Sequence, residues 1–358
     1  MLPSRLPDPV PPARHEIAAS YISRLATLHG LGISTLWTQT TTREPSGRMR
    51  RIVVPERLAA LTGRTVHELA GALPELRDPQ PDWAMFRHQP QPGCRYCDAK
   101  HPGGEVTRIL PHHRYVCTRH QIWICPSDAD GHTTRLDALP EIVQAQRRHL
   151  RILRRHGWAI TYDAVLTAML ICGQLWSLPE SENGEARHDW VRRANILIPP
   201  GTAEATFSVA RLCAAVYPEA VALAPLFASP YWRQQAQETT WNRRLFNAEI
   251  AHRLRHPSYN RKDHDNDPIS HWANMIAKRP PLAPIRVHDQ EHHLQKPALR
   301  TGTRLAQQRQ ARAFDPSHRA GEPLVTHRHL ATVFRRAWHP IRRHVLSPDG
   351  DSYYQLYG

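Results

Sequence analysis

The organisation of this chain is decided by residues 94–120, CRYCDAKHPGGEVTRILPHHRYVCTRH. Two residues separate Cys94 from Cys97, and two separate Cys117 from His120. This spacing lets a tight turn direct both side chains of a pair at one ion, and two such knuckles complete a tetrahedron around a metal. Three thiolates with one imidazole are a typical zinc donor set, so the sequence predicts one Zn²⁺ bound by these four residues.

The predicted zinc has a structural role. Four protein ligands fill its coordination sphere and leave no open position for water or substrate. Gly93, Gly103 and Gly104 suit the turns that such knuckles need, and Val106 and Ile109 predict a short strand between them. A module of this size has little apolar core, so we expect the metal to supply much of its folding free energy.

A second metal site near Cys125 is the less favoured alternative. Its partner position is Asp128 rather than a thiol, and Asp130 and His132 are the remaining donors nearby. The sequence therefore predicts one ion.

Composition places the chain among basic intracellular proteins. Its 358 residues are 41% apolar, which suggests two or three domains. The net charge of +15 favours polyanionic partners such as DNA, although a coding background rich in arginine would give the same excess. Six cysteines are too few for a disulfide scaffold, and no run of about 18 apolar residues predicts a membrane span. We expect a cytoplasmic protein.

The residues before the metal module predict short helices. Apolar residues recur at helical spacing over residues 16–28, and residues 57–61 and 66–73 form two further helices broken at Gly63. This outline resembles a helix-turn-helix. Its second helix offers a small set of DNA contacts (Arg64, Thr65, His67 and Glu68), so a hairpin that only packs is equally open.

The residues after the module predict a longer helical domain. Residues 140–156 form a basic helix with apolar residues near one face, and residues 162–176 are apolar nearly all round. Further helices are predicted over 203–216, 218–227 and 231–255. The other side of the basic helix carries five arginines that we predict contact DNA: Arg147, Arg148, Arg151, Arg154 and Arg155.

We therefore predict a mainly α-helical fold with a small zinc-knuckle module and a longer C-terminal helical domain. The predicted parts are an irregular leader (1–15), a helical, helix-turn-helix-like region (16–76), the zinc-binding module (77–139), a helical domain (140–255) and a polar, partly disordered C-terminal region (256–358).

Three stretches give the chain a resemblance to the TniQ family of transposition proteins. Residues 2–7 (LPSRLP), followed by the helix at 20–26 (SYISRLA), resemble the family's N-terminal segment. Residues 58–63 (LAALTG) are similar to its helix-turn-helix part, and the four metal ligands fall where its zinc finger places them, with LPHHR at 110–114 before the second pair. The resemblance covers about residues 1–155. Members of the family often carry a further CxxC after the second knuckle, where this chain has Cys125 alone.

The resemblance implies a non-catalytic adaptor in target-site selection, which links a DNA-bound or guide-RNA complex to an AAA+ regulator and a transposase. The residues agree that the chain is not an enzyme, because it has no GxxxxGKS, HExxH or GxSxG motif. Its acidic pairs, such as Asp263 with Asp265 and Asp349 with Asp351, lie in polar stretches typical of solvated loops. No small-molecule substrate is expected.

Two functional classes remain open and can coexist. As an adaptor, the chain would present rigid surfaces to proteins, with Trp37, Trp83 and Phe86 as candidate anchors. As a DNA-binding protein, it would contact phosphates through the basic helix without reading sequence. The alternative to a transposition adaptor is therefore a sequence-independent or regulatory DNA-binding protein unrelated to transposition.

Overall fold

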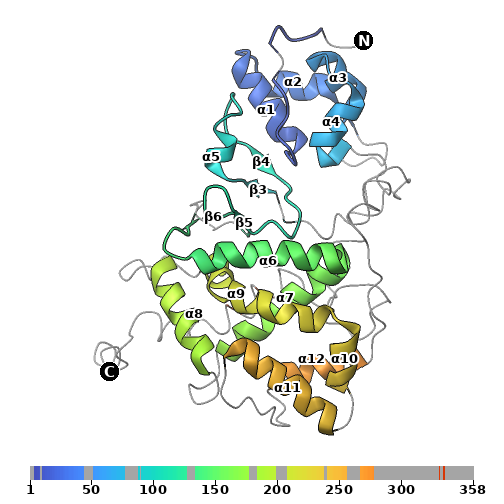
Figure 1. The fold of residues 1–358 in the computed structure, drawn as a ribbon. Coiled ribbons are helices and arrows are strands. Elements are labelled where there is room, and N and C mark those ends of the chain that lie inside the picture. The colour runs from blue at the N-terminus through green and yellow to red at the C-terminus, as the bar shows by residue number, and fades with distance from the viewer. Residues whose placement is uncertain are drawn as a thin grey trace, which may run out of the picture. The chain divides into compact units, whose positions relative to one another are not determined.

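A computed structural model describes residues 4–8, 10–43, 51–76, 88, 90–126, 134–176, 184–198, 208–237, 240–255, 267–277, 330 and 334. These residues form two compact units, the first ending at His112 and the second beginning at His113 (Figure 1). The described part of the chain is mostly helical, as predicted.

The first unit opens with helices that share one apolar core. The helices are α1 (Ala18–Leu28), α2 (Ile33–Thr40), α3 (Pro55–Thr62) and α4 (Val66–Ala72), followed by a 3-10 turn, η1 (Pro74–Leu76). Tyr21, Leu25, Leu58 and Leu69 are fully buried where these helices meet. Gly63 ends α3 in the left-handed conformation that glycine favours, at φ 67°.

An antiparallel hairpin was not predicted in the loop between α2 and α3. It pairs β1 (Thr41–Arg43) with β2 (Arg51–Val53), and Thr41 lies opposite Val53. Strands of three residues carry too little alternation to be recognised by hydrophobic period.

The same unit carries the first pair of predicted ligands. β3 (Gln91–Pro92) runs antiparallel to β4 (Thr107–Arg108), and the short helix α5 (Arg95–Asp98) lies between them in sequence. A further bridge pairs Glu16 with Arg108, so the segment just before α1 extends this small sheet.

The second unit begins with a three-stranded antiparallel sheet and continues in helices. The sheet has the order β5 (Val116–Cys117), β6 (Ile122–Trp123) and β7 (Thr134–Arg135). The helices are α6 (Pro140–His156), α7 (Trp158–Trp176), α8 (Gly184–Leu197), α9 (Val209–Ala228), α10 (Pro230–Gln237), α11 (Thr240–Leu254) and α12 (Pro268–Ala277).

Helix α9 is the centre of the second unit, and α6, α7 and α8 pack against it (Figure 1). It replaces the two predicted helices by one that continues through Pro218. Among the described helices, α9 is long and apolar enough to cross a membrane by length and composition, but 72% of that stretch is buried inside the protein. It also carries the buried Glu219, which accepts hydrogen bonds from Arg193 and Trp190. These features are those of a helix buried in the core of its unit.

Three predictions fall partly or wholly outside the described residues. Trp83, Phe86 and the acidic pairs at 263–265 and 349–351 lie there, as does most of the C-terminal region. Within that region α12 is described, and its Trp272 packs against Phe227 and Phe246. The boundaries of the five predicted parts stay predictions.

Candidate metal centre

The structure gathers the four predicted ligands into one group. One donor atom from each of Cys94, Cys97, Cys117 and His120 lies within 4.8 Å of every other. Cys94 is buried and the other three are half-buried. All six cysteines are free thiols, so no disulfide competes for these sulfur atoms. Among the described residues this is the one group of three or more potential ligands found.

The donor set fits a single tetrahedral ion. Zn–S bonds of about 2.3 Å in a tetrahedron place neighbouring sulfur atoms about 3.8 Å apart, slightly closer than the limit found here. Cys117 Sγ and His120 Nδ1 are already 3.6 Å apart. These residues can therefore hold one metal ion after only a small contraction of the group.

Helix α5 and a largely buried ion pair position the first ligands. Cys94 is the residue just before α5 and Cys97 lies within it, and the Asp98 amide donates to the Cys94 carbonyl at 2.9 Å. The Asp98 carboxylate pairs with Arg108 on β4, and a Cβ on Gly93 would meet both of these side chains. A side chain at 93 would thus displace the ion pair, which explains the glycine.

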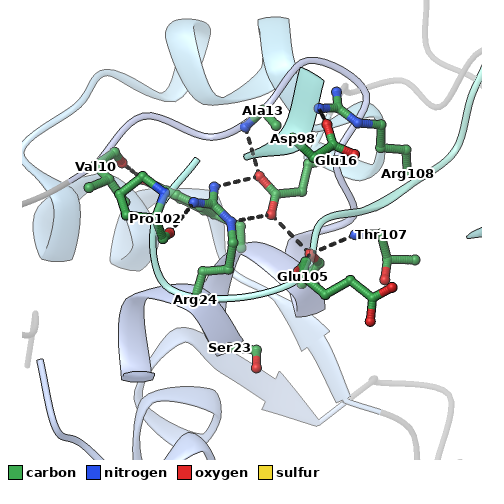
Figure 2. A network of polar contacts seen from close by, with 12 residues as sticks. Val10, Ala13, Glu16, Ser23, Arg24, Asp98, Pro102, Glu105, Thr107 and Arg108 are labelled. Carbon is green, nitrogen blue, oxygen red and sulfur yellow. Dashed lines mark hydrogen bonds and ion pairs between the residues drawn. The ribbon is translucent and has the colours of Figure 1, made fainter. Parts of the chain in front are cut away.

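A second buried ion pair fixes the loop that follows α5 (Figure 2). Arg24 on α1 donates through Nε and Nη2 to the two carboxylate oxygens of Glu16, each at 2.8 Å, and through Nη1 to the Pro102 carbonyl at 2.7 Å. Glu16 also accepts from the Ala13 amide at 2.7 Å. Both charged side chains are essentially inaccessible, at 0% and 1% exposure. The leader, α1 and the loop that follows α5 are thereby joined through one ion pair.

Gly103 allows this loop to approach α1. Its φ of 96° lies in the region that favours glycine, and a Cβ there would lie 2.5 Å from the Arg24 carbonyl oxygen. The predicted turn at Gly103 and Gly104 is confirmed, since Gly104 also has a positive φ of 123°.

Helix α6 positions the second ligand pair through Gln146. The buried Gln146 side chain accepts from the amides of Tyr115 and Val116, both at 3.0 Å, and donates to the His113 carbonyl at 2.7 Å. These contacts fix the strand that leads into Cys117. A tight turn then returns the chain to β6, with Gln121 at a φ of 51°.

An aromatic cluster surrounds this anchor. Tyr115 packs against Trp123, His149 and Tyr217, and Tyr217 Oη lies 2.8 Å from His149 Nδ1. Burial lowers the pKa of His149 to about 3, so its imidazole is neutral at physiological pH. The cluster holds α6, α9 and the sheet together without adding charge.

Cys125 is a core residue in this structure. It is fully buried, and burial raises the pKa of its thiol well above the ordinary value. It does not belong to the metal group. Asp128, Asp130 and His132, the other donors considered for a second site, lie outside the described residues.

Comparison with known proteins identifies no relative. No protein family, no curated protein and no solved structure matches this chain. The resemblance to the TniQ family therefore rests on the quoted residues alone.

The five predicted arginines share an exposed face. Arg147, Arg148, Arg151, Arg154 and Arg155 are all exposed on α6, while Ile142, Ala145, Gln146 and Leu153 on the opposite side are buried. At 100° per residue the five span an arc of about 120°. In the described part of the chain none of the five forms an ion pair with a carboxylate, and Glu141 on the same helix pairs with Arg192.

The predicted recognition helix offers less than its sequence suggested. Thr65 and Glu68 form a capping box, in which each side chain bonds to the other residue's backbone amide. Leu69 packs into the core, and His67 is exposed. Two of the four candidate DNA contacts are thus used to start α4, which favours a hairpin that packs.

Trp37, a candidate anchor for a protein partner, is half-buried against the apolar core of the first unit. Much of its ring surface therefore already contacts its own chain. Sequence reasoning missed the anchors of both ligand pairs. Nothing in the local sequence assigned a role to Glu16 or Arg24, and Gln146 was expected near the apolar face of its helix but without a partner; all three are buried.

Proposed function

We propose that this protein is a non-catalytic, zinc-binding adaptor in DNA transposition or target-site selection, and that α6 is its DNA contact. The observation that carries the proposal is the exposed arginine face of α6. Its buried face anchors the strand that leads into Cys117, so the arginines stand on a helix with a fixed orientation in its unit. The resemblance to the TniQ family supplies the transposition context.

The arrangement suits phosphates better than base edges. From Arg147 to Arg155 the helix rises about 12 Å, a length over which duplex DNA presents about seven phosphate charges. Five long cationic side chains in one arc can follow a phosphate backbone, and such contacts carry no sequence information. We expect affinity that falls steeply with salt and depends little on sequence.

The test is binding of the full chain to a short duplex over a range of salt concentrations. If all five arginines contact phosphates, their replacement by glutamine flattens the plot of log K against log salt by up to about 4.5 units. Unchanged affinity in that variant, with metal content and fold intact, rejects α6 as the DNA contact.

A charge-matched comparison separates local contact from net charge. The first triple variant changes three arginines of the α6 face to glutamine: Arg147, Arg151 and Arg155. The second changes three exposed arginines that already pair with carboxylates: Arg135, Arg192 and Arg255. Only the first set should weaken duplex binding strongly. Equal losses would mean that the chain's excess charge, rather than this face, attracts DNA.

The adaptor role needs its own measurement. AAA+ transposition regulators from the same genome serve as bait, and stable binding to the purified chain supports the transposition context. Duplex binding without any such partner favours the alternative, a sequence-independent DNA-binding protein unrelated to transposition.

A further inference from the structure

The first ligand pair displays a preformed layer of two side chains. Arg95 and Tyr96 stand between Cys94 and Cys97, both are exposed, and the tyrosine keeps 45% of its surface accessible. The Arg95 guanidinium carbon lies 4.9 Å from the centre of the Tyr96 ring. Arg95 Nη2 also donates to Tyr96 Oη at 3.0 Å. A cation–π contact and a hydrogen bond therefore hold the two side chains together.

The charges around this layer are mostly positive. Asp98, the nearest carboxylate in sequence, is committed to Arg108, and both side chains are only 11% exposed. Lys100, two residues after Asp98 in the sequence, is exposed, and Glu105 is the next exposed carboxylate along the chain. Burial lowers the pKa of the His101 imidazole, and the positive charges of Arg108, Arg24 and Lys100 lower it further.

We propose that the Arg95–Tyr96 layer is a stacking site for an unpaired base of single-stranded nucleic acid, with Lys100 contacting a neighbouring phosphate. Bases stack readily on tyrosine rings and on guanidinium planes, and every base offers the required flat face. The site uses different residues from the arginine face of α6, and it stands or falls independently of the proposed function.

The shape of the segment favours a single strand over a duplex. Helix α5 has only four residues, one turn, whereas direct reading of a duplex inserts a longer helix or a ribbon into the major groove. In a duplex the base faces are already stacked on one another. An exposed flat layer therefore gains most from a base that has left its stack.

The test compares binding of a short oligothymidylate and of a duplex by variants of the full chain. Tyr96→Leu keeps an apolar side chain but removes the ring, and it should weaken oligothymidylate binding by about tenfold without changing duplex binding. Tyr96→Phe keeps the ring and should bind like wild type. Arg95→Lys keeps the charge but not the plane, and it should weaken oligothymidylate binding with an unchanged salt dependence. The glutamine variant of α6 should lose duplex binding more than oligothymidylate binding.

Equal oligothymidylate affinity of the Leu and Phe variants overturns the proposal. If the Leu variant loses its metal, photocross-linking of the wild-type chain to an iododeoxyuridine oligonucleotide decides instead. An adduct on residues 95–100 supports the stacking site, and adducts confined to other parts of the chain reject it. If the α6 variant loses only duplex binding, that result supports α6 as the duplex contact and leaves the result for the Tyr96 variants to decide the stacking site.

Discussion

Removal of the Arg24 guanidinium tests whether its buried ion pair with Glu16 holds the loop that follows α5. Arg24→Met keeps most of the side-chain volume but leaves the Glu16 carboxylate buried, with the Ala13 amide and the Ser20 hydroxyl as its remaining donors. Breaking a buried pair by removing one partner costs about 3–5 kcal/mol. Because two donors to Glu16 remain, we expect a loss near the lower end, about 3 kcal/mol of unfolding free energy.

Hydrogen exchange of the metal-loaded protein measures this loss in the unit that contains the pair. Amides of α1 and of the loop at 102–108 should lose protection, whereas those of α7 and α9 should not. The Glu16→Gln, Arg24→Met double variant leaves no buried charge and should be clearly more stable than the single variant. The exposed control Arg147→Met should change stability by less than about 0.5 kcal/mol. A single variant as stable as that control, or a double variant no better than the single, would refute the reasoning.

Three further changes test other parts of the structure. Cys117→Ser should lower metal content, measured by elemental analysis, to well below one ion per chain; unchanged content removes the metal centre. Gly103→Ala forces a side chain against the Arg24 carbonyl and should destabilise the first unit by more than about 1 kcal/mol in hydrogen exchange, with Gly104→Ala, which meets nothing within 4 Å, as a milder control. His149 has a pKa lowered to about 3 by burial, so the unfolded chain binds its proton first as pH falls. The second unit should therefore lose about 1.4 kcal/mol per pH unit between the ordinary histidine pKa of 6.5 and about 3, and His149→Asn should flatten urea midpoints over that range. Parallel curves for the two proteins would contradict this assignment.

The features that local spacing encodes were predictable. The two ligands of each pair are three positions apart, so Cys94, Cys97, Cys117 and His120 were recognisable from their intervals alone. Helical periodicity likewise placed the α6 arginines on one side, and all five are exposed.

Long-range contacts could not be predicted from spacing. Arg24 meets a loop 78 residues further along the chain, and nothing near Glu16 or Arg24 in the sequence signals burial of a charge. Gln146 was expected near the apolar face of its helix, but its partners could not be predicted because they lie more than thirty residues away in the sequence. Proline at 218 suggested a break in the helix, but packing on three neighbouring helices keeps α9 continuous.

The burial of α9 has a consequence during synthesis of the protein. Translation proceeds from the N-terminus, and α6, α7 and α8 all precede α9 in the chain. When this helix, which is long and apolar enough to resemble a membrane span, leaves the ribosome, three of the helices that pack against it have therefore already been synthesised. Its one buried acid, Glu219, likewise meets Arg193, which was synthesised earlier. Chain order thus shortens the time during which a segment resembling a membrane span is available to the insertion machinery or to other nascent chains.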